Sequence, residues 1–135
     1  MDYQKAAKEF CKTFEGKEIR KVTRLFDEGF KGMYVILRIL RDSESEVIPS
    51  DIAKKMDIST ARVAAALNTL SRKNYIQRIP AANGGKRVIV EITPEGRQAL
   101  AQREIKVNAL IMDFFKRLSE DEIQSLISIV KKLFQ

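Results

Sequence analysis

Histidine is absent from this 135-residue sequence, and cysteine occurs only once, as Cys11. One cysteine cannot form an internal disulfide bond, and the usual zinc sites require histidine or several cysteines. We therefore expect no metal site and no cofactor. The same absences argue against an enzyme, because no histidine can serve as a general base or activate the thiol. The chain also lacks a G-x-S-x-G motif and a glycine-rich phosphate loop.

Long apolar runs are missing as well. No segment approaches the roughly 18 uncharged apolar residues of a membrane-spanning helix. The N-terminal residues MDYQKAAKEF carry charges every few positions and contain no apolar signal region. No stretch rich in proline, glycine or serine divides the chain. We expect a cytoplasmic protein without membrane association, folded as a single domain over residues 1–135.

The chain does contain a local excess of positive charge. Its net charge is +7, and eight basic residues but only one acid, Asp57, lie between Lys54 and Arg87. The rest of the chain holds 17 basic and 17 acidic residues. Positive charge confined to one quarter of a chain is typical of a site for nucleic acid. A solvated basic surface without a partner is the alternative, and the location of the charge favours nucleic acid.

Hydrophobic periodicity predicts a mainly helical first half. Apolar residues at helical spacing indicate an amphipathic helical region over about residues 1–30, with a break near Gly16. Residues 32–41 are almost wholly apolar and predict a buried helix. A short helix over 50–56, entered through Pro49, follows a polar loop. Asp57 and Ile58 then form a tight turn into another helix.

This next helix begins at Ser59, a favourable N-cap residue. At 100° per residue, Val63, Leu67 and Leu70 form one narrow stripe that packs on the core, and the opposite face is small and polar. Two helices joined by a turn of about three residues, the second with a free face, form a helix-turn-helix, whose second helix enters the major groove of DNA. Alanine is also the best helix former, so the alanines alone do not decide the function. The predicted DNA contacts of this helix are Ser59, Thr60, Ala61, Arg62, Ala64, Ala65, Asn68, Thr69 and Arg72.

Two runs typical of β-strands, residues 75–79 and 87–92, follow this helix and flank the turn sequence AANGGKR. A hairpin directly after a helix-turn-helix is the wing of a winged helix. Asparagine and glycine suit the turn itself, and the two cations suit contacts with phosphates or the minor groove. The predicted wing contacts are Asn83, Gly84, Gly85, Lys86 and Arg87. The predicted contacts to the DNA backbone are Ser50, Lys54, Lys55 and Arg78.

Two long amphipathic helices are predicted at the end of the chain. Thr93 and Pro94 begin the first, whose apolar stripe runs for about six turns to Leu118. Ser119 opens the second with a capping box, S-x-x-E. These helices present more apolar surface than a small winged lobe (about 32–93) can cover, so we predict a homodimer built from residues of about 1–30 and 94–135. The predicted interface residues are Tyr3, Phe10, Phe14, Leu110, Phe114, Phe115, Ile123, Leu126, Ile127, Val130 and Phe134.

The segment from Ile48 to Gly96, IPSDIAKKMDISTARVAAALNTLSRKNYIQRIPAANGGKRVIVEITPEG, resembles the helix-turn-helix and wing of the MarR family of transcriptional regulators. ITPEGRQAL is similar to that family's exit from the wing into a dimerisation helix, and SEDEIQSLISIVKKL to its final helix. The resemblance implies a mainly α fold with a small β-hairpin and an obligate dimer. It implies that two recognition helices enter successive major grooves of a pseudo-palindromic operator. It also implies a small-molecule pocket between the dimerisation helices and the DNA-binding lobe. We therefore expect a repressor that a small organic effector releases.

The sequence departs from the family in the wing and in the recognition helix. The wing usually has an acid that orients its arginine, and the matching positions here are Gly84, Gly85 and Lys86. Base reading is therefore expected to depend on Thr60, Arg62 and Asn68, together with methyl contacts to thymine.

Two alternatives accompany this reading. Some MarR-like proteins sense peroxides through an N-terminal cysteine, but Cys11 lies beside Phe10 and Phe14, where a thiol usually packs as a small hydrophobic group. We favour the packing role over a redox switch. The second alternative is a winged-helix module that binds protein instead of DNA. Such a module does not need clustered cations, so charge location favours DNA.

Overall fold

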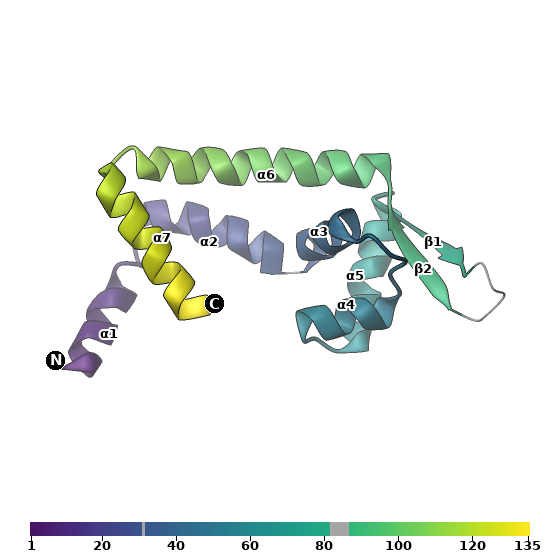
Figure 1. Cartoon of the computed structure of the whole chain (residues 1–135), viewed down its shortest axis with the longest axis horizontal. Helices are drawn as coiled ribbons and strands as arrows, with labels where there is room; N and C mark the ends of the chain where they lie inside the picture. The colour runs from purple at the N-terminus through teal and green to yellow at the C-terminus, as the bar shows by residue number, and fades with distance from the viewer. Residues whose placement is uncertain (31, 82–86) are drawn as a thin grey trace. The chain divides into compact units, whose positions relative to one another are not determined.

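The structure consists of helices and one β-hairpin, in the order that Figure 1 shows. The computed structural model describes residues 1–30, 32–81 and 87–135, with the backbone alone for 25–30. The chain divides into two compact units, Met1–Ala101 and Gln102–Gln135. The predicted fold class, mainly α with a small β-hairpin, is confirmed. The elements are α1 (Tyr3–Lys12), α2 (Lys17–Phe30), α3 (Met33–Asp42), α4 (Pro49–Met56), α5 (Thr60–Arg72), β1 (Ile76–Pro80), β2 (Val88–Ile92), α6 (Pro94–Phe115) and α7 (Glu120–Phe134).

The core of the first unit lies where α3, α4 and α5 meet the hairpin. The predicted stripe of α5 is confirmed, because Val63, Leu67 and Leu70 are all buried. Burial of one such side chain stabilises the fold by about 1.5–3 kcal/mol, so this cluster holds α5 firmly on its inner face. The buried members of the cluster are Ile36, Leu37, Leu40, Val47, Ile52, Ala53, Val63, Leu67, Leu70, Ile76, Val90 and Leu100.

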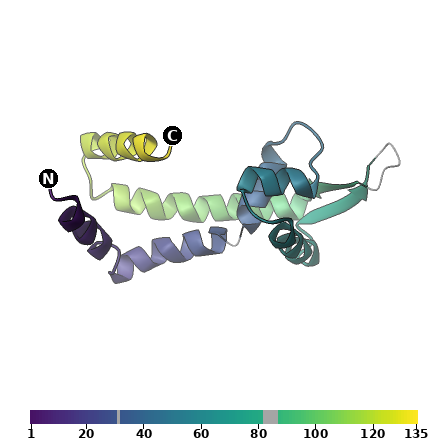
Figure 2. The same cartoon turned by 90° about the horizontal axis from the view of Figure 1, so that it is seen from below.

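The hairpin pairs β1 and β2 in antiparallel register, with Ile76 opposite Ile92. It projects from the helices of the first unit, as the turned view in Figure 2 shows. The backbone N–H of Val90 donates to the carbonyl of Val47 at 2.8 Å, so the segment before α4 lies along the other edge of β2. β1 begins one residue later than predicted, because the N–H of Tyr75 bonds to the Leu70 carbonyl at 3.0 Å and closes the end of α5.

Helix ends follow the predicted local signals. The hydroxyl of Ser59 accepts the N–H of Arg62 at 3.2 Å. At α7, Ser119 Oγ accepts the N–H of Glu122, and Glu122 Oε2 accepts the N–H of Ser119 at 2.8 Å, which completes the predicted capping box. Asn74 follows α5 with φ 62°, the predicted left-handed conformation.

The long helix α6 ends earlier than predicted. Leu118 was expected on its apolar stripe, but α6 ends at Phe115 and Leu118 is 38% exposed. The N–H groups of Arg117 and Leu118 bond three residues back, to Phe114 and Phe115, and such tighter bonds commonly close a helix. None of the helices in the described part of the chain combines the length and the apolar content needed to cross a membrane.

Candidate nucleic-acid interface

A helix-turn-helix, formed by α4 and α5, lies within the first unit. Asp57 ends α4 with φ 51°, and its N–H bonds back to the carbonyls of Ala53 and Lys54. Aspartate tolerates this left-handed conformation, so the turn does not need glycine. Ile58 packs against the core and Ser59 caps α5. The turn of three residues predicted between the two helices is therefore present.

The outer face of α5 is open to solvent. Of the nine residues predicted to contact DNA, eight are exposed and Thr69 is half-buried. The Thr69 hydroxyl donates to the Ala65 carbonyl at 3.2 Å and accepts from Arg72 Nη2 at 3.3 Å. Alanine side chains on this face leave the helix backbone close to the surface, which allows close approach to base edges and thymine methyl groups.

A cation from the hairpin lies against this face. Arg78 of β1 donates from Nη2 to Oδ1 of Asn68 in α5 at 2.8 Å. Arg78 is a predicted contact to the DNA backbone and Asn68 a predicted contact to bases, and the hydrogen bond between their side chains was not predicted. No local signal connects two residues ten positions apart on different elements, so only the packing of β1 beside α5 reveals the pair.

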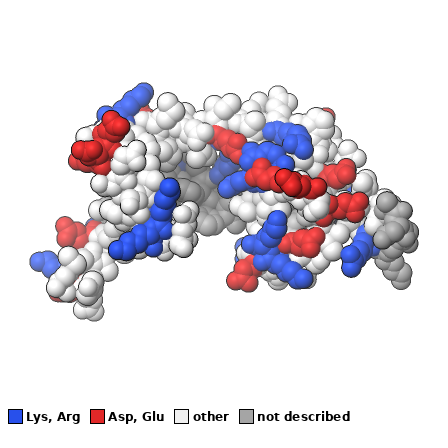
Figure 3. All heavy atoms as spheres, viewed as in Figure 1, with Lys and Arg blue, Asp and Glu red and all other residues white. Residues whose placement is uncertain are grey.

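The predicted backbone contacts of α4 are exposed at its two ends. Ser50 lies in its first turn, and Lys54 and Lys55 lie in its last. Helix N-termini favour phosphate oxygens, and lysines neutralise them. Figure 3 shows Lys and Arg atoms over the region of α4 and α5, with a few acidic atoms among them, and further basic atoms beside the grey end of the hairpin.

The wing is described only in part. Arg87 is exposed immediately before β2, and its carbonyl accepts the N–H of Ala81 at 3.1 Å. The predicted contacts Asn83, Gly84, Gly85 and Lys86 lie outside the described residues.

The hairpin returns to the helices through a compact hydrogen-bonded junction. Thr93, 2% exposed, donates from its hydroxyl to the Asn74 carbonyl at 2.7 Å and from its N–H to the Tyr75 carbonyl at 3.0 Å. Its hydroxyl also accepts the N–H of Gly96 at 3.0 Å, which is the predicted cap of α6. A Cβ on Gly96 would lie 2.1 Å from the Tyr75 oxygen, so only glycine fits. The junction joins the end of α5 to the start of α6.

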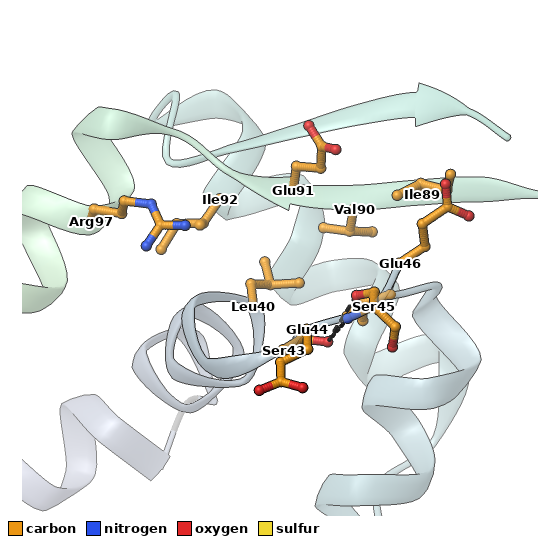
Figure 4. A pocket seen from close by; sticks show the side chains of 11 residues that line it. Leu40, Ser43, Glu44, Ser45, Glu46, Ile89, Val90, Glu91, Ile92 and Arg97 are labelled. Carbon is orange, nitrogen blue, oxygen red and sulfur yellow. Dashed lines mark hydrogen bonds between the residues drawn. The ribbon is translucent and has the colours of Figure 1, made fainter. Parts of the chain in front are cut away.

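A cavity of about 310 Å³ lies on the other side of β2 (Figure 4). Leu40 and Val90 point toward one another in its apolar part. Its polar residues include three carboxylates, of Glu44, Glu46 and Glu91, and the guanidinium of Arg97. The sequence did not predict this cavity, because its walls come from four separate segments.

The residues predicted at a dimer interface are exposed or half-buried in the single chain. α1 and α7 bury none of their residues. Exposed large apolar side chains include Tyr3, Phe10, Phe14, Leu126, Ile127, Val130 and Phe134, and the half-buried predicted residues are Leu110, Phe114, Phe115 and Ile123. Cys11 is also exposed on α1. Within the described residues, no group of three or more Cys, Asp or Glu side chains is placed to hold a metal ion.

Comparisons with known proteins agree with this geometry. A family profile described as "Winged helix DNA-binding domain" matches residues 34–111. The HTH-type transcriptional regulator YwhA of Bacillus subtilis, itself uncharacterized, is 31% identical over 121 residues, which cover 85% of this chain and 86% of YwhA. A proposed transcriptional regulatory protein for the hcr operon of Thauera aromatica is 31% identical over 104 residues, 77% of this chain. The match spans only 62% of that relative's length.

Solved structures show the same fold. A mutant of MarR from E. coli, crystallised with operator DNA, has a TM-score of 0.65 at 22% identity, and the match covers 87% of this chain and 89% of that one. The fold and the homologues are those of transcriptional regulators and not of enzymes. The predicted resemblance is confirmed, and the chain belongs to the MarR family of winged-helix transcriptional regulators.

Proposed function

We propose that this chain is a homodimeric repressor that binds a pseudo-palindromic DNA operator. The observation that carries the proposal is the two-faced helix α5. Its inner face is held by Val63, Leu67 and Leu70, and its outer face is open and lies in the segment that holds the chain's excess positive charge. A helix anchored in this way can enter the major groove without unfolding the core. The operator complex of the MarR mutant supports the same use of the fold.

In the proposed complex, three groups of residues contact DNA. The outer face of α5 reads base edges through Ser59, Thr60, Ala61, Arg62, Ala64, Ala65, Asn68, Thr69 and Arg72. The wing contacts phosphates or the minor groove through Asn83, Gly84, Gly85, Lys86 and Arg87. The backbone contacts are Ser50, Lys54, Lys55 and Arg78. Contacts of the wing and of the backbone group with phosphates release counterions. The affinity that they supply therefore falls steeply as the salt concentration rises.

The dimer is proposed from the terminal helices, with residues 1–135 acting as one functional domain. Apolar side chains on α1 and α7, which bury no residue in the single chain, would be covered by a second copy. Two copies place two recognition helices one helical turn of DNA apart and so require a two-fold operator. Access to chromosomal DNA places the protein in the cytoplasm.

The proposal includes a small organic effector that releases the repressor. The cavity beside β2 has a volume at the lower end of the range for small-molecule sites. The residues around the cavity carry three carboxylates and one guanidinium, and this net negative charge favours a compound that carries an amine. A panel of aromatic amines and carboxylic acids, screened by thermal unfolding, tests this. If an amine raises the Tm of the wild type but not that of the Glu91→Gln variant, the result supports this site. If the amine raises both Tm values equally, the effector binds elsewhere.

Selection from a random duplex library is the direct test of operator binding. We expect enrichment of a two-fold site whose half-sites are about 10 base pairs apart. Binding to the enriched site is then measured over a series of salt concentrations. The double variant Lys54→Ala/Lys55→Ala should weaken binding to all sequences and flatten the salt dependence. The matched control is Lys131→Ala/Lys132→Ala, which removes an adjacent lysine pair from the last turn of α7.

Two results would contradict the proposal. A monomeric mass at micromolar concentration, measured by analytical ultracentrifugation, rejects the dimer. The second result is that no sequence is enriched and that DNA affinity depends on salt equally in both lysine variants. A winged-helix module that binds protein would then be the better explanation.

A further inference from the structure

Asn68 and Arg78 are joined side chain to side chain, although they lie on different elements. The guanidinium Nη2 of Arg78 is 2.8 Å from Oδ1 of Asn68. We infer that the two residues act as one unit that presents chiefly hydrogen-bond donors to the major groove and selects guanine at one position of each operator half-site. This inference rests on the proposed DNA-binding function.

The fold itself places Arg78 at the recognition helix. Side chains two residues apart on a strand point to the same face, so Arg78 shares a face of β1 with Ile76. Ile76 is 3% exposed and belongs to the core cluster that also holds Leu67 and Leu70 of α5. Arg78 therefore extends along the same side, just beyond the point where the core ends. Asn68 lies on the outer face of α5, four residues after Ala64 and four before Arg72.

The hydrogen bond decides which atoms remain for DNA. An arginine side chain has five N–H donors and no acceptor, and an asparagine side chain has two N–H donors and one acceptor oxygen. Because Oδ1 of Asn68 accepts from Arg78, the amide is held in one of its two orientations and its NH2 group is turned away from the guanidinium. Within the described residues Arg78 forms no ion pair with a carboxylate, so its full positive charge remains beside Oδ1.

Guanine and adenine present different hydrogen-bonding groups to such a unit in the major groove. Guanine presents two acceptors, N7 and O6, whereas adenine presents the N7 acceptor and the N6 amino donor. A free asparagine pairs with adenine through both of its amide groups. Here Oδ1 keeps one free lone pair, but the adenine amino group would have to reach it beside the positively charged guanidinium of Arg78, which repels a second donor. The acceptor edge of guanine meets the donors of Asn68 and Arg78 without that conflict.

Operator selection with variants tests the unit. Wild type, Arg78→Ala, Asn68→Ala and the double variant are each used to select duplexes from a random library. We expect the wild type to prefer guanine over adenine at one position per half-site by roughly tenfold or more. Arg78→Ala frees Oδ1, so the preference at that position should move from guanine toward adenine. Asn68→Ala and the double variant should show no preference for adenine there.

Arg72→Ala is the matched control. Arg72 is an exposed arginine on the same face that donates to the Thr69 hydroxyl, so its removal takes away the same charge without freeing Asn68. The control should weaken binding but keep the preference for guanine at the tested position. Dissociation constants for duplexes that differ only at this base pair measure the change, and thermal unfolding verifies that each variant is folded.

The outcomes are distinguishable. If Arg78→Ala lowers affinity equally for all sequences and leaves the selected bases unchanged, Arg78 contacts only phosphate and the inference is wrong. If the wild type prefers adenine at this position and Asn68→Ala abolishes that preference, the inferred selection of guanine is also wrong, although DNA binding stands. If no sequence is selected by the wild type, the proposed function itself fails.

Discussion

Gly96 is a position where one methyl group should have a large effect. In Gly96→Ala the new Cβ would lie 2.1 Å from the Tyr75 carbonyl oxygen and 3.0 Å from Cγ1 of Ile92. Ordinary contact begins at 3.4 Å, so the helix start must move by about 1.3 Å relative to Tyr75. That oxygen accepts the N–H of buried Thr93 at 3.0 Å, and the movement would break this bond.

The magnitude follows from three contributions. Overpacking costs about 1–3 kcal/mol. A buried N–H left without a partner costs about 1–3 kcal/mol. Alanine favours a helix over glycine by at most about 1 kcal/mol, which offsets part of the loss. We expect Gly96→Ala to lower the free energy of unfolding by about 3 kcal/mol, which corresponds to a fall of roughly 10 °C in Tm for a chain of this size.

Thermal unfolding followed by circular dichroism measures this change. Wild type and variants are compared at one protein concentration, because the Tm of a dimer depends on concentration. Gly16→Ala is the matched control, since a Cβ at Gly16 meets nothing within 4 Å. We expect the control to unfold within a few degrees of wild type. A Gly96→Ala protein as stable as the Gly16→Ala protein would refute the steric reasoning.

Three further predictions concern single side chains. Ser119→Ala removes the cap of α7 and should cost about 1 kcal/mol in urea unfolding, whereas Ser125→Ala within the same helix should cost nothing; equal stabilities would contradict the capping role. Arg87→Ala should reduce the slope of log affinity against log salt by about 1, measured by fluorescence anisotropy, and an unchanged slope would remove Arg87 from the interface. The hydrogen bond from Arg41 holds the pKa of the Asp42 carboxyl below its usual value of 3.8. Because this pKa is lower in the folded state, the pair stabilises the protein at neutral pH, and the stabilisation is lost as the pH falls through the lowered pKa. On acidification, the free energy of unfolding of the Asp42→Asn protein should therefore fall less than that of wild type. An equal fall in both proteins would show that the Arg41–Asp42 pair does not contribute.

Local signals allowed much of the fold to be predicted. Ser59, Asn74 and Ser119 act through hydrogen bonds or backbone angles within a few residues, so their roles follow from sequence spacing alone. The buried stripe of α5 follows from helical geometry in the same way. The end of α6 was placed too late, because an apolar pattern can continue past the last helical turn.

The candidate site was predicted in its residues but not in its connections. Arg62 and Lys54 were recognised from charge and helical position, and both are exposed as expected. The bond between Asn68 and Arg78 depends on how the hairpin packs beside α5, and the cavity beside β2 depends on the course of the loop before α4. Neither arrangement is encoded by the spacing of neighbouring residues.

The sequence by itself determined the order of the helices and strands, the buried and open faces of α5, and the location of positive charge, because each of these depends on neighbours within a few turns of chain. The tertiary structure alone decided which side chains meet across elements. It joined Arg78 to Asn68, placed Tyr75 so that only glycine fits at position 96, and laid Val47 along β2. The physical reason is that such contacts arise from packing between distant segments, where a shift of about 1 Å changes which atoms can touch.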